Sequence, residues 1–454
     1  METIGSLWWF IVSIGVLVTF HEFGHYWVAR RCGVKVLRFS VGFGRPLWMR
    51  RGRDGTEFVV AAIPLGGYVK MLDEREGEVP AAEQSQAFNR QSVYERIAIA
   101  AAGPVANIVL CVALLWGAFI VGIPEYAPVV GRAEGMAAAA GLHAGDEVLK
   151  VGDRETPTWT DVQFALAVAG LDRARVPVEV RTRDGDTRTR TLDLAKLPAD
   201  FDELRAADTI GLVARHRLQA PIVDDIVEGS PAYGVLAEGD RVIAVDGQPV
   251  ADFGDIAPAV KALAQRGGPG MIEVERTASD GTTNRLALPL TPVLQRQEDG
   301  TQRAMLGIAA RSSGQPPPFD ALRRYGPVEA VPMAFRETWQ KASDTVGFMR
   351  RMITGNASLK YVSGPITTAR AANATANLGL AWFLNFLAIL SISLAILNLL
   401  PIPLLDGGHL LYYLIELVKG SPLSERTMAA GQYVGLALLV GLMGLALFND
   451  VFHW

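Results

Sequence analysis

The chain has 454 residues, of which 50% are hydrophobic and 20% are charged, so it is more apolar than most soluble proteins. A net charge of -4, without a basic patch carrying aromatic residues, excludes nucleic acid as a partner. The two cysteines, Cys32 and Cys111, are too few for a disulfide framework and argue against a cysteine-based zinc site.

Four apolar blocks are long enough to cross a bilayer, which takes about 20 residues. They are Ile4–Val28, Ile97–Val121, Leu378–Leu400 and Met428–Phe448. No positive charge precedes the first block and arginines follow it, so we interpret it as an uncleaved anchor. The segment after it is rich in Lys and Arg and is therefore assigned to the cytoplasm. Both termini, and the long region between the second and third spans, are then expected in the periplasm of a bacterium.

The pattern His21-Glu22-Phe23-Gly24-His25 lies at the end of the first apolar block. Residues four apart share a helix face, so His21 and His25 can present their imidazoles to one metal ion. Glu22 is placed to accept a proton from a water molecule that the metal activates. Ionisable residues at membrane depth are costly, which makes this group a functional-site candidate. The alternative is that these side chains follow a membrane helix and bind nothing.

The end of the third apolar block is expected at the same depth, because the first and third spans run in the same direction. It reads Asn398-Leu399-Leu400-Pro401-Ile402-Pro403-Leu404-Leu405-Asp406-Gly407-Gly408-His409. The prolines interrupt the helix, and non-helical backbone at this depth must be surrounded by protein or water. A catalytic zinc commonly has three protein ligands, so we expect Asp406 to be the third. The alternatives are a plain Asp-Gly turn, or His409 as the ligand, although a supporting role suits His409 better.

Residues 38–71 alternate apolar side chains with glycines, which predicts short β-strands. An ordinary cytoplasmic hairpin would explain them. The alternative is a membrane-associated, re-entrant sheet whose edge pairs with an unwound substrate by strand addition.

The second span begins with the motif Gly103-Pro104-Val105-Ala106-Asn107. We assign this motif a structural role, in which Asn107 hydrogen-bonds to a neighbouring helix.

The region between the second and third spans contains an internal repeat. Gly141–Gly152 and Val235–Gly247 both carry a Gly-Asp pair followed by an apolar run, at a domain-sized separation. This pattern resembles the core of PDZ domains, which bind peptides by β-augmentation. The alternative is two generic small β-rich domains. A proline-rich linker at Arg311–Pro318 and an amphipathic helical segment at Pro327–Ile353 follow.

These motifs together resemble the site-2 type intramembrane zinc metalloproteases, and within them the branch that regulates the sigma-E envelope-stress response. The likeness covers the whole chain and includes the His-Glu motif, Gly42-Phe43-Gly44, Ile63–Met71, Ala102–Asn107, both repeats and Asn398–Asp406. It implies a polytopic α-helical membrane protein with four transmembrane helices. A membrane-associated β-hairpin region and two periplasmic PDZ-like β-rich domains complete the implied fold.

The resemblance implies zinc held by His21, His25 and Asp406, with Glu22 as the general base. The substrate-binding residues that it implies are Asn398, Pro401, Pro403, Gly42, Phe43, Gly44, Gly66 and Gly67. The implied substrates are single-span inner-membrane proteins already trimmed on the periplasmic side, notably an anti-sigma factor, together with signal peptide remnants. The PDZ pair would act as a size filter. Ser393 departs from the pattern, which leads us to expect asparagine there.

The expected domains follow from these assignments. They are a first transmembrane helix at 1–30, a cytoplasmic-side β region at 31–96, a second transmembrane helix at 97–122, PDZ-like domains at 123–218 and 219–312, a linker with amphipathic periplasmic helices at 313–377, a third transmembrane helix at 378–409, and a cytoplasmic loop with the fourth transmembrane helix at 410–454.

Two other functions compete with proteolysis in the membrane: a non-enzymatic scaffold, and a zinc protease for soluble periplasmic peptides. The intact metal motifs argue against the scaffold. Their expected position at the cytoplasmic ends of the spans argues against a protease for periplasmic peptides.

Overall fold

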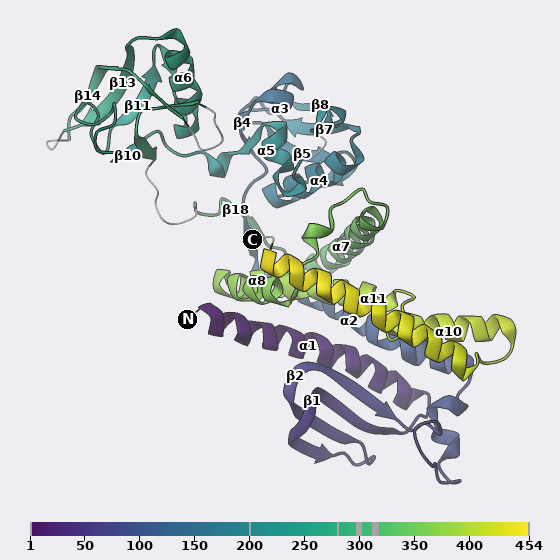
Figure 1. Ribbon diagram of the computed structural model, residues 1–454. Coiled ribbons are helices and arrows are strands. Elements are labelled where there is room, and N and C mark those ends of the chain that lie inside the picture. The colour runs from purple at the N-terminus through teal and green to yellow at the C-terminus, as the bar shows by residue number, and fades with distance from the viewer. Residues whose placement is uncertain (1, 199–200, 279–280, 297–301, 311–316, 453–454) are drawn as a thin grey trace. The chain divides into compact units, whose positions relative to one another are not determined.

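The computed structural model describes residues 2–198, 201–278, 281–296, 302–310 and 317–452 (Figure 1). Residues 311–316 of the expected linker lie outside this range. The chain divides into two compact units, one formed by Met1–Ile123 with Leu322–Trp454 and the other by Pro124–Ala321. Each unit is described by itself below.

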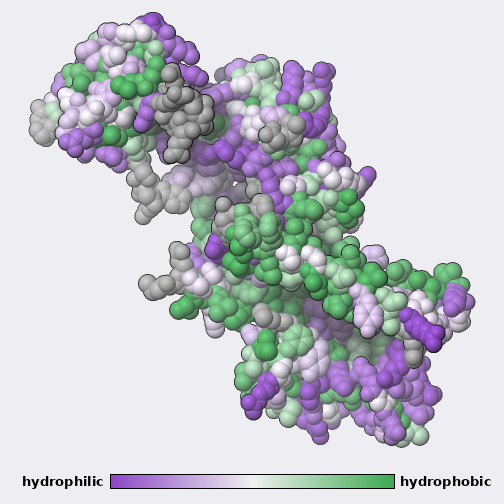
Figure 2. Space-filling view, in the orientation of Figure 1, coloured by the Kyte–Doolittle hydropathy of each residue, from purple (hydrophilic) through white to green (hydrophobic). Residues whose placement is uncertain are grey.

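Four long apolar helices dominate the first unit. They are α1 (Glu2–Arg31), α2 (Val93–Val121), α9 (Leu380–Leu399) and α11 (Glu425–Phe452). All four are long and apolar enough to cross a membrane, which confirms the expected number of spans. Helix α1 packs along α2 (Figure 1), and α2 also packs along α9. Figure 2 shows apolar residues gathered over this unit, and exposed side chains such as Trp8, Val109 and Val440 are what a lipid-facing surface requires.

The start of α2 and the end of α9 follow from local sequence. A capping box starts α2, in which Ser92 and Glu95 each accept the other's backbone N–H. Helix α9 ends at Leu399, and the segment with Pro401 and Pro403 that follows is not helical. Within this segment Leu404 has a φ of 87°, which is unusual for a residue other than glycine.

Helix α10 (Asp406–Lys419) begins immediately afterwards, where the sequence analysis placed a loop from residue 410. The sequence pattern did not predict this helix, for two reasons. Gly407 and Gly408 are poor helix formers, and the segment is too short to cross a membrane. Because α10 begins at Asp406, its first residue is the expected third metal ligand.

Two further helices precede α9. The amphipathic segment forms α7 (Ala330–Ile353), and α8 (Pro365–Leu378) follows it. On α7, the Glu337 carboxylate pairs with Arg323 at 3.0 Å and with Lys341 at 3.1 Å. The N-terminus of α8 is fixed by α11, because the Asp450 carboxylate accepts hydrogen bonds from the backbone N–H groups of Gly364 and Ile366 and from the Thr367 hydroxyl.

The region between α1 and α2 forms two long strands where short ones were expected. Strand β1 (Val36–Arg51) pairs with β2 (Glu57–Met71), with Val36 opposite Met71 at one end and Arg51 opposite Glu57 at the other. Both strands bend at glycines with positive φ: Gly42 (92°), Gly44 (87°) and Gly66 (134°). Because of the bends, Phe39 pairs with Phe58 as well as with Val69.

The edge of this sheet at residues 67–71 is open. Residues 67–71 of β2 pair with the first half of β1, and no other strand in the described part of the chain pairs with their outer side. An open strand edge presents unpaired backbone N–H and C=O groups to whatever lies beside it.

The second unit holds two four-stranded sheets with the same strand order, β6-β5-β7-β8 and β12-β11-β13-β14. The first consists of β5 (Glu147–Val151), β6 (Arg154–Glu155), β7 (Arg175–Arg181) and β8 (Thr187–Asp193), with helix α4 (Trp159–Asp172). The second consists of β11 (Arg241–Val245), β12 (Gln248–Pro249), β13 (Gly270–Thr277) and β14 (Thr283–Leu290), with helix α6 (Phe253–Arg266).

The shared Gly-Asp pair has the same role in both halves. Asp146 accepts the backbone N–H of His143 at 2.9 Å, and Asp240 accepts that of Ala237 at 2.9 Å. Both aspartates are buried, and each half has its own hydrophobic core. The repeat in the sequence is therefore a repeat in the structure.

The remaining strands and α-helices of the described residues are short. They are β3 (Ile123–Glu125), β4 (Val130–Ala133), α3 (Gly135–Ala139), α5 (Ala206–Ile210), β9 (Leu212–Ala214), β10 (Val223–Ile226), β15 (Val293–Arg296), β16 (Gln302–Met305), β17 (Ile308–Ala310) and β18 (Ala321–Arg323).

Candidate metal centre

The three expected metal ligands meet at one point of the first unit. His21 and His25 come from α1, and Asp406 is the first residue of α10. The Nε2 atoms of the two histidines are 3.3 Å apart. Asp406 Oδ2 lies 3.1 Å from His21 Nε2, and Asp406 Oδ1 lies 3.5 Å from His25 Nε2. Residues almost 400 positions apart in the sequence thus form one cluster of ligand atoms.

The spacing of these atoms fits a tetrahedral zinc ion. Zinc–nitrogen and zinc–oxygen bonds of about 2.0–2.1 Å at tetrahedral angles place the ligand atoms about 3.3 Å from one another. The separation of 3.3 Å between the two Nε2 atoms matches this value, and the Asp406 carboxylate faces each of them with a different oxygen, at 3.1 and 3.5 Å. Apart from its contact with His21, the buried Asp406 Oδ2 has no hydrogen-bond partner among the described residues, so this oxygen is available as a ligand.

Helix α2 supplies the groups that orient both histidines. His25 Nδ1 lies 2.8 Å from the Ile99 carbonyl oxygen, and the Asn107 side-chain amide lies 3.2 Å from His21 Nδ1. Donation from His25 Nδ1 to the Ile99 carbonyl leaves His25 Nε2 for a metal, as is usual for metal-ligating histidines. The same state of His21 requires the Asn107 amide to turn its oxygen, which has no other partner among the described residues, towards Nδ1. Ser391 on α9 donates to the backbone carbonyl of Asn107 at 2.8 Å.

The sequence analysis expected Asn107 to bond to a neighbouring helix but did not identify its partner as a metal ligand. The sequence does contain one signal for the contact between Asn107 and the histidine motif. A polar residue at the start of the second span lies at the depth of the histidine motif at the end of the first, because the two spans run in opposite directions.

Two glycines let α1 and α2 approach each other at the histidines. A Cβ atom on Gly24 would collide with the backbone of Ala102. A Cβ atom on Gly103 would collide with His25 Nε2 and lie 2.7 Å from His21 Cε1. Small residues allow such close contact between membrane helices. The motif around Gly103 therefore shapes the metal centre directly.

A cavity of about 980 Å³ contains the three ligands and Glu22. Residues 67–71, the open edge of β2, form one of its walls. Gly67 brings this edge close to the site, because a Cβ on it would lie 3.2 Å from Glu22 Cγ. The remaining wall is rich in ionisable side chains: Asp73, Arg75, Glu76, Arg96, His409 and Glu416. Water can therefore reach the space between Glu22 and the ligands.

The other expected substrate-binding residues of the β region lie outside the cavity wall. Gly42, Phe43, Gly44 and Gly66 are not among the described residues that line it. Phe43 nevertheless supports the wall, because its ring stacks on that of Tyr68 at a centroid distance of 6.1 Å, and Tyr68 lines the cavity.

Asn398, Pro401 and Pro403 are likewise absent from the described part of the cavity wall. Pro403 is a packing residue in this structure. A Cβ on Gly408 would lie 2.7 Å from Pro403 Cα, and one on Gly435 would lie 3.1 Å from Pro403 Cβ. These contacts hold the non-helical segment between α10 and α11.

Comparison with known proteins gives full-length matches. A model of peptidase family M50 matches residues 9–442. A protein of Xylella fastidiosa that carries the words zinc metalloprotease in its name is 53% identical over 450 residues, which are 99% of each chain. The regulator of sigma-E protease RseP of Escherichia coli is 42% identical over 447 residues, which are 97% of each chain. Protease RseP of Yersinia pestis is 40% identical over 454 residues, which are 99% of each chain.

Proposed function

The chain belongs to peptidase family M50, as its motifs indicated, and from this membership we propose that it is an intramembrane zinc endopeptidase. The single observation that supports this best is the meeting of His21, His25 and Asp406 beside Glu22, in one cavity among helices apolar enough to cross a membrane. A scaffold would have no use for two histidines and an aspartate whose ligand atoms cluster beside a glutamate.

The proposed chemistry divides between the metal and Glu22. His21, His25 and Asp406 would hold the zinc, which when bound supplies a Lewis acid that polarises a carbonyl and makes water more acidic. Glu22 lies one residue from His21 and lines the same cavity. Its carboxylate accepts the proton of the attacking water and afterwards delivers a proton to the leaving amine.

The substrate is proposed to bind as an added strand. Proteolysis needs an extended backbone, and the open edge at residues 67–71 runs beside Glu22 and the ligands. Gly42, Phe43, Gly44 and Gly66 would shape the bends that present this edge. Asn398, Pro401 and Pro403 would help to seat the substrate from the segment before Asp406.

Relatives that are named regulator of sigma-E protease support a substrate in the sigma-E pathway. We propose that the substrates are single-span proteins already trimmed on the periplasmic side, an anti-sigma factor above all, and also remnant signal peptides. The two repeated sheets support an assignment as PDZ-like domains, and these domains are proposed to exclude untrimmed substrates. The proposed location is the bacterial inner membrane, with both termini and the PDZ-like pair periplasmic.

The test uses full-length protein in detergent and two single-span model substrates, one with and one without a periplasmic domain. We expect wild type to cut the trimmed substrate much faster than the untrimmed one. Equal rates for the two would contradict the size filter but not the protease. Binding of the trimmed substrate without cleavage by zinc-loaded wild type would favour the scaffold.

The orientation is tested separately by reporter fusions. A reporter placed after Arg30 should report the cytoplasm, and one placed within the second unit should report the periplasm. The opposite result would overturn the proposed topology.

A further inference from the structure

Asp406 differs from the other two ligands in how it is held. His21 and His25 share one helix, and α2 fixes both of their rings. Asp406 stands at the start of a different helix, after a non-helical segment that contains Leu404 at positive φ. The position of this ligand therefore depends on how α10 is attached to the helices that carry the histidines.

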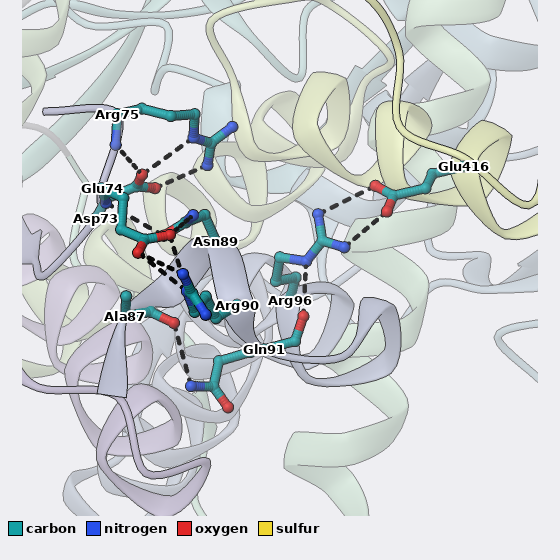
Figure 3. A network of polar contacts seen from close by, with 9 residues as sticks. All are labelled: Asp73, Glu74, Arg75, Ala87, Asn89, Arg90, Gln91, Arg96 and Glu416. Atoms are coloured by element: carbon teal, nitrogen blue, oxygen red, sulfur yellow. Dashed lines mark hydrogen bonds and ion pairs between the residues drawn. The ribbon is translucent and has the colours of Figure 1, made fainter. Parts of the chain in front are cut away.

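Helix α10 packs along α2, and one ion pair fixes it there (Figure 3). The guanidinium of Arg96 on α2 donates to both carboxylate oxygens of Glu416 on α10, at 3.0 and 2.7 Å. Each side chain is only 12% exposed. Arg96 also donates to the Gln91 carbonyl at 3.2 Å and lies over the ring of Tyr413, 5.0 Å from its centroid. Such a two-pronged contact fixes orientation as well as distance.

The Arg96–Glu416 pair has no equivalent elsewhere between α10 and the helices α1 and α2, within the described part of the chain. Apart from the contacts of Asp406 with the histidines, it is the one ion pair that joins α10 to α1 or α2. Arg96 lies one turn before Ile99, which holds His25. Glu416 lies about 15 Å along α10 from Asp406. Helix α2 thus holds both halves of the site, the histidines through Ile99 and Asn107 and the aspartate through Arg96.

We propose that Arg96 and Glu416 are positioning residues that set the Asp406 carboxylate against the two histidines. This inference rests on the proposed function, because it concerns the same metal site. Removal of either charge leaves the other buried without its counter-charge, and α10 loses the contact that orients it on α2. Replacement of Arg96 by Lys would keep the charge but lose the two-pronged geometry.

The test is a charge-reversal cycle in the full-length protein in detergent: Arg96→Glu, Glu416→Arg and the double variant. Two readouts are independent of proteolysis, namely the rate of zinc loss to a chelator and the absorption spectrum of the cobalt-substituted protein. We expect each single variant to lose zinc about tenfold faster or more, with an altered cobalt spectrum. The double variant should recover most of both properties.

Glu74→Gln is the matched control. Glu74 pairs with Arg90 at 2.9 Å in the same polar network, but neither residue belongs to α10 (Figure 3). Its zinc loss should equal that of wild type. Single reversals with normal zinc retention and a normal cobalt spectrum would overturn the inference while leaving the proposed function intact. Faster zinc loss that the double variant does not recover would also overturn it. A wild type that binds no zinc would overturn the proposed function itself.

Discussion

Gly103 is the position where one added methyl group should damage the metal centre most selectively. Alanine is favoured over glycine inside a helix by about 0.8–1 kcal/mol, so the substitution alone should stabilise α2. At Gly103, however, the new Cβ would lie 2.7 Å from His21 Cε1, 2.8 Å from His21 Nε2, and closer still to His25 Nε2.

The size of the effect follows from these distances. An ordinary contact needs about 3.5 Å, so the rings must move by about 0.7 Å or more. A metal site tolerates about 0.2 Å. The overpacking should cost about 1–3 kcal/mol, and we expect the zinc affinity of Gly103→Ala to fall by about 10- to 100-fold or more.

Gly117→Ala on the same helix is the control. Its Cβ would lie 3.5 Å from Leu384 Cδ1, which is an ordinary contact, so zinc binding should be unchanged and thermal stability equal or higher. The assay is competition for zinc with a chelator, with a thermal melt of each purified variant. A Gly103→Ala protein that holds zinc as tightly as wild type would refute the inferred packing of α2 against the histidines.

Three further outcomes are expected. Asn107→Leu should weaken zinc binding by about 10- to 100-fold, whereas Asn107→Asp, which keeps an acceptor for the imidazole, should retain more of it; chelator competition measures both. Asp406→Ala should purify without zinc, whereas His409→Ala should keep it, and metal analysis that shows the reverse would make His409 the ligand. Burial alone would raise the pKa of Glu337, but its two basic partners outweigh burial and hold it at about 2, below the ordinary 4.5. The pairing therefore stabilises the fold above about pH 4.5 and is lost as the pH falls towards 2, so the difference in melting temperature between wild type and Glu337→Gln should shrink over that range.

The sequence predicted the elements of this site that depend on short-range pattern and on depth in the membrane. The spacing of His21 and His25 places both on one helix face, and the shared direction of the first and third spans led to Asp406. The structure brings these three residues together. A repeat in the Gly-Asp pattern likewise pointed to the two sheets that share a strand order.

Features that depend on how helices are rotated against one another were not predictable. The direct contact of Gly103 and Asn107 with the histidines requires α2 to present one particular face to α1. Arg96 and Glu416 are far apart in the sequence, and each alone resembles an ordinary charge at a helix end. Helix α10 was missed because its first turn contains two glycines, which pack against the backbone of residues 399–403.

The most direct test of the central claim is to map the cut that the purified protein makes in a trimmed single-span substrate. Wild type and Glu22→Gln are prepared in parallel, zinc is measured in both, and the products are identified by mass spectrometry. We expect wild type to cut within the apolar segment, and Glu22→Gln to hold zinc but leave the substrate intact. Cleavage by Glu22→Gln at the same bond, or cleavage by wild type only outside the apolar segment, would contradict the account.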